Sequence, residues 1–470
     1  MKNNIYKLIE IKLVGFLMVI LLLGCSSTKN LKRNITVTVD ALHEYQTIDG
    51  FGGTEHWLFP PASEYSRLFD ELGVSILRFR MLRYVESTPD QPGNELAEND
   101  NDDPNMINWD RVNKRYFATM APLLKAAQSR GVKLFGNIMS PPPWMKTSNI
   151  AKGHGALKSG YEDELVEFIL IWVKGIEKYH GVHIDYVNFQ NEPNYQAPYP
   201  SCYISPQQII ILTRLLGKRF KAEGISTKII PPETSNLNKF IDYSKAICND
   251  ADAKIFAHLL TTHSYNINFF KPDKNNNNWA NAYDLANKCG KRLWLTEYCL
   301  DYNNEAKGTW KEAITLVQHV HNALVFGHVS AWLYHELYRD PSKSPLALID
   351  KGIDPYPKFY ALKQYFRYVR PGAVRIKSES SNKDILATAF IHKKNDTITI
   401  VVINRTTFNQ NISFTINNIK GLSKLKVIRT TSKQNTSELG QISVFKDSFT
   451  YMLPGKSITS FIGHISTAKE

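Results

Sequence analysis

The sequence predicts a (β/α)8 TIM barrel with a C-terminal all-β sandwich as a side domain. Strand-like and helix-like segments alternate between residues 46 and 370, with eight strand candidates. Such alternation favours a parallel sheet, and eight repeats favour closure into a barrel. After Val374, short strands follow one another without intervening helices. The 470 residues provide room for a barrel of about 250 residues and a smaller domain.

The N-terminus has the pattern of an export signal. Lysines precede an apolar run at residues 13–23, which is short for a membrane span. The run closes as Leu-Leu-Gly-Cys, which resembles a bacterial lipobox. Residues 1–24 are therefore predicted to be a signal peptide, Cys25 the lipidated first residue, and residues 25–33 a polar tether. An ordinary membrane anchor is the alternative. In both cases the folded part is expected outside the cytoplasm, and Ser26 resembles a signal for sorting to the outer membrane.

Residues 34–45 are predicted to join the side domain. Polar and apolar residues alternate at positions 35–39, as in a half-exposed strand that has no place in the barrel order. The next segment, residues 46–53, is a short strand broken by glycines, which are typical of close backbone approach or positive φ.

The barrel is assigned to residues 46–370. Helical spacing of apolar residues predicts helices between the strands. After the strand that contains Gly50, the other predicted strands are 74–80, 132–137, 184–189, 228–233, 255–265, 292–297 and 329–334, and the main helices are 65–72, 116–130, 163–179, 209–222 and 310–325. Residues 371–467 are assigned to the sandwich, with strands at 385–391, 397–402, 412–416, 425–428 and 458–462.

Composition excludes several classes of function. The hydrophobic fraction of 43% is that of a globular protein. The net charge of +13 permits binding of anionic polymers, but no basic cluster with interleaved aromatics indicates nucleic acid. No Cys-x-x-Cys pair or His-x-x-x-His spacing indicates a metal site. We expect a monomer that needs no cofactor or metal. The remaining cysteines are expected to be buried thiols, with a Cys289–Cys299 bridge as the alternative; the four are Cys202, Cys248, Cys289 and Cys299.

Two carboxylates stand at equivalent places in the predicted barrel. Glu192, in Asn191-Glu192-Pro193, ends the fourth strand, and Glu297 ends the seventh. The carboxyl ends of barrel strands form one mouth, where catalytic groups of such barrels lie. Two carboxylates facing a sugar are the minimum equipment for glycoside hydrolysis, with one acting as acid and the other as an ionised group. A loop glutamate or a structural ion pair is the alternative for each residue alone.

Four motifs resemble glycoside hydrolase family 30. They are Gln46-Thr47-Ile48-Asp49-Gly50-Phe51-Gly52-Gly53, Asn191-Glu192-Pro193, Thr296-Glu297 and Val369-Arg370-Pro371-Gly372-Ala373-Val374-Arg375. The resemblance covers nearly the whole mature chain and implies a retaining β-glycosidase. By this resemblance Glu192 is the acid/base, Glu297 is the nucleophile that forms a covalent glycosyl intermediate, and Asn191 binds the sugar 2-hydroxyl.

Other candidate substrate-binding residues follow strand ends. The loop Ser140–Lys146 resembles the family's Pro-rich loop, and Trp144 in it is predicted to stack on a sugar. Trp332 and Tyr334 at the end of the eighth strand receive the same prediction, and packing in the core is the alternative for all three residues. Further candidates are Arg78, as an ion-pair partner of Glu297; Tyr265, as a donor to the nucleophile; and His263. Glu233, after the fifth strand, is assigned either to a loop ion pair or to a role in supporting the residues of the site.

The substrate is predicted to be a plant or algal cell-wall polysaccharide, with β-1,4-xylan or glucuronoxylan first. Residues 310–376 resemble the glucuronoxylanase branch, which holds a glucuronate with paired arginines after the eighth strand. Here those arginines are missing, Glu336 adds a negative charge, and Arg339 is the remaining candidate. A β-1,6-glucanase or β-1,6-galactanase of the same family is one alternative, and a non-catalytic glycan-binding lipoprotein is another.

Overall fold

The computed structural model describes residues 34–55, 59–86, 99–265, 267–300, 304–340 and 346–466. The predicted signal peptide, the tether and the lipidation site at Cys25 lie outside these residues. No helix in the described ranges is both long and apolar enough to span a membrane.

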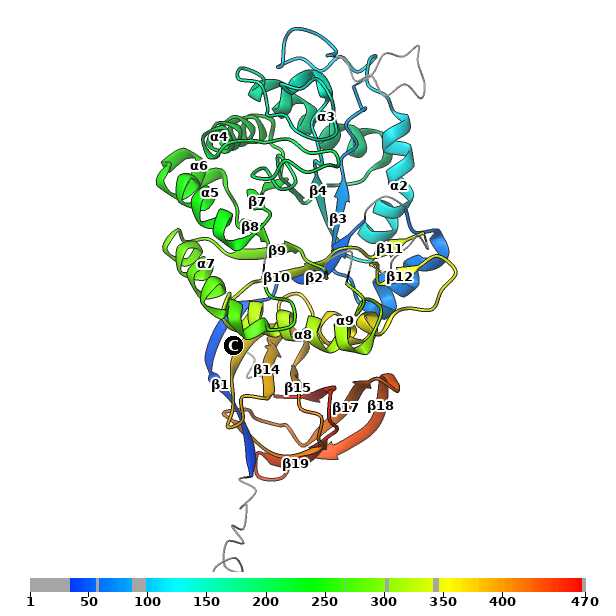
Figure 1. Cartoon of the computed structure of the whole chain (residues 1–470), viewed down its shortest axis with the longest axis vertical. Helices are drawn as coiled ribbons and strands as arrows, with labels where there is room; N and C mark the ends of the chain where they lie inside the picture. The colour runs from blue at the N-terminus through cyan, green and yellow to red at the C-terminus, as the bar shows by residue number, and fades with distance from the viewer. Residues whose placement is uncertain are drawn as a thin grey trace, which may run out of the picture. The chain divides into compact units, whose positions relative to one another are not determined.

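A parallel, TIM-like sheet surrounded by helices confirms the predicted fold class (Figure 1). Its strands lie in the order β6-β5-β4-β3-β2-β10-β9-β8-β7. They are β2 (Gly50–Thr54), β3 (Ile76–Arg80), β4 (Lys133–Asn137), β5 (Tyr186–Val187), β6 (Lys228–Ile229), β7 (Pro232–Thr234), β8 (Leu260–His263), β9 (Leu293–Glu297) and β10 (Ala331–Tyr334). Since only Ile230 and Pro231 separate β6 from β7, these two segments together fill the fifth strand position.

The helices are α2 (Arg115–Gln128), α3 (Glu162–His180), α4 (Pro206–Glu223), α5 (Leu237–Asn249), α6 (Ala251–Phe256), α7 (Asn276–Lys288), α8 (Trp310–Val325) and α9 (Pro357–Phe366). Local sequence sets their ends. For example, α4 begins at a capping box in which Ser205 accepts from the backbone N–H of Gln208. Helix α3 ends at Gly181, whose φ of 67° is a conformation that glycine adopts easily.

The barrel interior is filled by side chains of alternate strand positions. Ile76, Trp294, Ala331 and Leu333 belong to one inner cluster. In β2, Gly52 lies so close to its neighbour strand that an added Cβ would stand 1.8 Å from the carbonyl oxygen of Ile76. This close approach explains the glycine-rich strand.

Two predicted elements differ from the structure. Residues 255–258 were expected to begin the sixth strand, but Ile255 and Phe256 end helix α6, which Asp250 caps by accepting from the N–H of Ala253. The strand itself is confined to Leu260–His263. The predicted helix 65–72 consists of a 3₁₀ turn at Ala62–Glu64 and a π-helical segment at Ser66–Leu72.

The C-terminal domain is a β-sandwich that includes an N-terminal strand, as predicted. Its sheet order is β18-β17-β20-β15-β14-β13-β1-β16-β19, and Figure 1 shows the blue strand β1 among these later strands. The rings of Phe414 on β16 and Phe461 on β20 lie 5.2 Å apart, so distant parts of the sheet face each other. The strands are β1 (Ile35–Thr47), β13 (Val374–Ser380), β14 (Ile385–His392), β15 (Thr397–Asn404), β16 (Gln410–Asn417), β17 (Lys424–Thr431), β18 (Gln434–Ser443), β19 (Ser448–Leu453) and β20 (Ser457–His464).

The cysteine prediction was partly wrong. Cys202 and Cys299 are buried thiols, as expected. Cys248 and Cys289, however, form a disulfide with their Cα atoms 5.5 Å apart. Cys248 lies at the end of α5 and Cys289 at the end of α7, and these helices pack against each other. A contact between two helices separated by a strand leaves no local signal in the sequence. The buried-thiol prediction is therefore wrong for Cys248 and Cys289, and so is the alternative Cys289–Cys299 bridge.

Candidate active site

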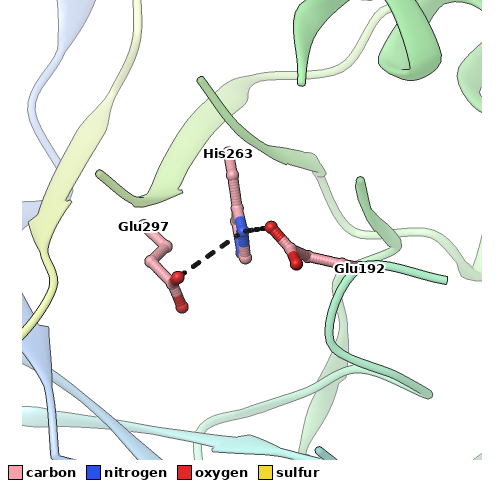
Figure 2. A group of neighbouring side chains, drawn as sticks. All are labelled: Glu192, His263 and Glu297. Carbon is pink, nitrogen blue, oxygen red and sulfur yellow. Dashed lines mark hydrogen bonds and ion pairs between the residues drawn. The ribbon is translucent and has the colours of Figure 1, made fainter. Parts of the chain in front are cut away.

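Glu192 and Glu297 meet at the carboxyl ends of the barrel strands. One carboxylate oxygen of each, together with one ring nitrogen of His263, lies within 4.8 Å of the others. Figure 2 shows the His263 ring between the two carboxylates. A register shift between β8 and β9 pairs Thr262 with Leu295 but His263 with Glu297. A bulge of this kind changes the direction in which side chains point at a strand end. Here it occurs next to Glu297, whose side chain points into the site at the end of the barrel.

Arg78, in the middle of β3, contacts three groups of the site. Its guanidinium donates to Glu297 Oε2 at 2.8 Å, to Glu233 Oε1 at 2.7 Å and to Asn191 Oδ1 at 2.6 Å. The side chain is fully buried. Burial opposes its charge, but Glu233 and Glu297 outweigh that effect and raise the pKa of Arg78. The predicted ion pair between Arg78 and Glu297 is therefore present.

His263 is a buried imidazole surrounded by carboxylates. Its Nδ1 lies 3.0 Å from Glu192 Oε1, and its Nε2 lies 3.6 Å from Glu233 Oε1. Burial would lower the pKa of His263, but Glu297, Glu192 and Glu233 raise it from 6.5 to about 9. His263 is thus an imidazolium at neutral pH. Because the folded pKa is the higher one, this network stabilises the fold fully below pH 6.5 and loses that contribution as the pH rises through about 9.

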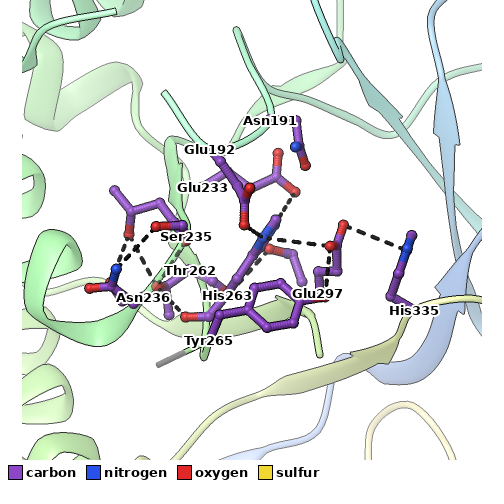
Figure 3. A network of polar contacts seen from close by, with 12 residues as sticks. Asn191, Glu192, Glu233, Ser235, Asn236, Thr262, His263, Tyr265, Glu297 and His335 are labelled. Carbon is purple, nitrogen blue, oxygen red and sulfur yellow. Dashed lines mark hydrogen bonds and ion pairs between the residues drawn. The ribbon is translucent and has the colours of Figure 1, made fainter. Parts of the chain in front are cut away.

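Glu297 is held in its ionised form. Tyr265 donates to Oε1 at 2.9 Å, as predicted from the sequence, and Arg78 donates to Oε2. His335 Nδ1 lies 3.8 Å from Oε2. Burial would raise the pKa of Glu297, but the neighbouring His335, His263 and Arg78 and the Tyr265 hydrogen bond lower it from 4.5 to about 2. Burial lowers the pKa of His335 itself, so Arg78 and His263 are the cations that face Glu297 at neutral pH. Figure 3 shows Tyr265, His263 and His335 around Glu297.

Glu192 has different partners. Tyr199 donates to Oε2 at 2.7 Å, while Oε1 faces the imidazolium of His263. The Glu192 backbone has a φ of 50°, and Glu233 a φ of 59°. Non-glycine residues rarely adopt this left-handed conformation, and they often do so at functional sites. The backbone N–H of Glu192 donates to the carbonyl of Glu233 at 3.1 Å, which links the two strained positions.

Both carboxylates open into a pocket of about 850 Å³. Its walls are mainly aromatic and apolar. Tyr195 and Phe270 line it and remain 47% and 39% exposed, respectively. Exposed aromatic faces beside a polar centre suit a sugar ring, which has apolar C–H faces and polar edges. The lining residues are Met139, Asn191, Glu192, Tyr195, Tyr199, Ser235, Tyr265, Ile267, Phe269, Phe270, Glu297, Tyr298, Cys299, Leu300, Asn304 and His335.

Three aromatic candidates lie elsewhere. Trp332 and Tyr334 are fully buried. Ala331 and Leu333 face the barrel interior, so the alternate residues Trp332 and Tyr334 face the helices. Tyr334 donates its hydroxyl proton to the carbonyl of Leu346. This placement contradicts the prediction that Trp332 and Tyr334 stack on a sugar.

Trp144 is not among the residues that line the pocket. It lies in a short 3₁₀ turn, packs against the main core and has its ring centroid 5.8 Å from that of Tyr161.

The charged residues after the eighth strand also lie away from the pocket lining. Arg339 is in β11 (Tyr338–Arg339), which pairs with β12 (Ile349–Asp350), and its guanidinium lies 3.5 Å from Glu336. Glu336 is fully buried, and burial raises its pKa to about 8. Glu336 was expected to present a negative charge to the substrate. That expectation was wrong, because the carboxyl is inside the protein and mostly protonated at neutral pH.

Sequence reasoning missed Tyr199 and His335 and gave Glu233 no catalytic role. Glu233 does form an ion pair, as predicted, but its partner is Arg78 within the site. His335 directly follows the eighth strand, and this position alone could have marked it as a candidate site residue. Tyr199 lies in the loop after Glu192, and its hydroxyl reaches the Glu192 carboxylate only because the loop folds back. The sequence does not indicate the course of that loop.

Glu192, His263 and Glu297 also have the spacing of a metal site. Their atoms already have other partners: Arg78 and Tyr265 bind Glu297, and Tyr199 binds Glu192. The pKa of His263, about 9, leaves it protonated at neutral pH, whereas a metal ligand must be a neutral imidazole. The donor set therefore fits a carboxylate pair better than a metal centre.

Comparisons with known proteins agree with this geometry. A model described as O-Glycosyl hydrolase family 30 matches residues 106–338, and one described as Glycosyl hydrolase family 30 beta sandwich domain matches residues 372–461. Glucuronoxylanase XynC of Bacillus subtilis (strain 168) is 27% identical over 98% of this chain and 99% of its own. Endo-1,6-beta-D-glucanase BGN16.3 of Trichoderma harzianum is 31% identical over 36% of this chain and 38% of its own.

A solved structure shares the fold. The family 30 subfamily 8 xylanase Xyn30A from Clostridium acetobutylicum superposes with a TM-score of 0.76 at 23% identity, covering 91% of this chain and 99% of that one. The two family models, the fold and the paired carboxylates lead to one conclusion: this chain is an enzyme that belongs to glycoside hydrolase family 30.

Proposed function

We propose that this enzyme is a retaining β-glycoside hydrolase that cleaves β-1,4-xylan through a covalent glycosyl–enzyme intermediate. The observation that carries the mechanism is the spacing of Glu192 and Glu297, whose nearest oxygens lie within 4.8 Å. Retaining enzymes have carboxyl groups about 5 Å apart, whereas inverting enzymes need about 6.5–9.5 Å to admit a water.

In the first step, Glu297 attacks the anomeric carbon. A bond forms between a carboxylate oxygen of Glu297 and C1, the bond between C1 and the glycosidic oxygen breaks, and Glu192 gives its proton to that oxygen. The low pKa of Glu297 supports the nucleophile role, since the group is ionised across the working range. Both oxygens of Glu192 have a partner, His263 at Oε1 and Tyr199 at Oε2. The proton for transfer is assigned to Oε2, because its partner Tyr199 lines the pocket whereas His263 does not.

In the second step, Glu192 acts as the base. It takes a proton from a water, the water oxygen bonds to C1, and the ester bond to Glu297 breaks, which restores both groups. Asn191 lines the pocket beside them, with its Oδ1 fixed by Arg78. The Asn191 amide N–H₂ is thereby free to donate to a sugar hydroxyl.

The pocket lining supports a neutral substrate. Among the described residues that line it, none is a lysine or arginine, and Arg339 lies elsewhere. Xylan without obligatory glucuronate recognition is therefore the first candidate. The similarity to XynC supports the xylan backbone, and that to BGN16.3 supports a β-1,6-glucanase as the second candidate.

Product profiles by mass spectrometry distinguish these substrates. We expect xylo-oligosaccharides from both linear xylan and glucuronoxylan and no release from β-1,6-glucan, with the Glu297→Ala variant as the blank. Release from β-1,6-glucan alone would establish the second candidate. Products from glucuronoxylan alone, each with its branch at one fixed position, would contradict the neutral-substrate assignment.

A lipid anchor at Cys25 on the outer membrane remains part of the proposal. The Cys248–Cys289 disulfide supports it, since such bonds persist mainly in oxidising compartments. Labelled palmitate is expected to be incorporated into the parent expressed in a bacterial host and not into Cys25→Ser. Equal labelling of the two would contradict the anchor.

A further inference from the structure

Glu233 is a third buried carboxylate in the site. It lies in β7, has no measurable exposure and does not line the pocket. It therefore does not touch the substrate space. Figure 3 shows Glu233 beside Glu192, next to the His263 ring.

Glu233 contacts both buried cations of the site through one oxygen. Oε1 accepts from Arg78 Nε at 2.7 Å and lies 3.6 Å from His263 Nε2. Arg78 in turn binds the nucleophile, and His263 contacts the acid/base. The backbone carbonyl of Glu233 also accepts from the N–H of Glu192.

The charges of these five groups explain why a third carboxylate is needed. Two buried cations, Arg78 and His263, face the catalytic pair, and one member of that pair must carry a proton for the first step. His335 also faces Glu297, but burial lowers its pKa, so it is counted as neutral. With Glu192 protonated, Glu297 alone would oppose two positive charges. Burying an unbalanced charge is costly, and an imidazolium in that position would lose its proton. An ionised Glu233 supplies the second negative charge and leaves the group neutral.

We propose that Glu233 is a positioning residue that keeps His263 protonated and holds Arg78 in place, so that each cation stays on its catalytic carboxylate. This role rests on the proposed two-carboxylate mechanism. It is separable from it, because the state of His263 can be measured without turnover.

The test is the titration of His263 by NMR in protein with ¹⁵N-labelled histidine, the His263 signals being assigned with a His263→Asn variant. In the parent, the midpoint is expected near the raised pKa of about 9. In Glu233→Gln, which has the same shape but no charge, the midpoint is expected to fall by more than one pH unit. Glu233→Asp keeps the charge and is expected to lie between the two.

Glu55→Gln is the matched control. Glu55 is also buried and bound to a strand-end arginine, Arg80 at 2.8 Å. Both variants remove a buried ion pair and are expected to lower the melting temperature. Only Glu233→Gln is expected to move the His263 midpoint and to lower kcat roughly 10- to 100-fold with little change in KM, the scale of a misplacement of catalytic groups by about 1 Å.

Two results would overturn the proposal: a parent midpoint near the ordinary 6.5, or the same midpoint in the parent and Glu233→Gln. If Glu233→Gln does not fold, the His263 midpoints of the parent and of Glu233→Asp still test the proposal. The two proposals can fail separately. If the parent enzyme is inactive but its His263 midpoint is raised and depends on Glu233, the proposed function is refuted and this inference is retained.

Discussion

Replacing Glu297 with alanine is expected to lower kcat on xylan by about 10⁴-fold or more, a loss typical of removing a catalytic nucleophile. The reason is that, among the described residues, Glu297 is the carboxylate that accepts from both Arg78 and Tyr265 and can attack C1. The variant lacks the side chain but keeps a space where a small anion fits. Azide is therefore expected to restore cleavage of an activated aryl glycoside and to yield the α-glycosyl azide.

The measurement is steady-state hydrolysis with and without azide, followed by NMR of the azide product. Glu336→Gln is the matched control, since it removes a buried carboxyl that does not line the pocket. It is expected to keep most of the parent's activity. A Glu297→Ala enzyme that hydrolyses xylan as fast as the parent would exclude Glu297 as nucleophile.

Replacing Glu192 with alanine is expected to produce a loss that depends on the leaving group. On xylan, kcat/KM is expected to fall roughly 10²- to 10⁴-fold, the usual contribution of general acid–base catalysis. On a dinitrophenyl glycoside, whose leaving group departs without a proton, the first step is expected to remain fast. The intermediate on Glu297 then accumulates, because no base activates water.

A burst of dinitrophenol followed by a slow steady state is the expected record for Glu192→Ala. Azide is expected to accelerate that steady state and to yield the β-glycosyl azide, the opposite anomer from the Glu297 variant. An equal loss on both substrates, with no effect of azide, would show that Glu192 is not the acid/base.

The positions of the proposed catalytic pair could be predicted because strand ends are local features. Glu192 and Glu297 each end an apolar strand, and the strand count alone placed them at one mouth. Arg78 and Tyr265 followed from the same reasoning, and both now contact Glu297. His263 was also placed correctly in the site, although its charge depends on three carboxylates from different strands and has no sequence signature.

The wrong or missing predictions have a common physical origin. Each depended on which face of a strand a side chain occupies or on the course of a loop in space. Trp332 and Tyr334 are one residue out of phase with the inward-facing Ala331 and Leu333, and a shift by one residue exchanges the two faces of a strand. Tyr199 returns to Glu192 only through the course of its loop. The Cys248–Cys289 bridge joins α5 and α7, which pack against each other although the two cysteines are 41 residues apart in the sequence.

The most direct test of the mechanism is the anomeric configuration of the first product. Proton NMR recorded within the first minutes of xylan hydrolysis, before mutarotation, distinguishes the α and β anomers at the new reducing end. The spacing of Glu192 and Glu297 predicts that the β anomer appears first and the α anomer grows in later. An α anomer at the earliest times would mean inversion, and it would contradict the covalent intermediate on Glu297.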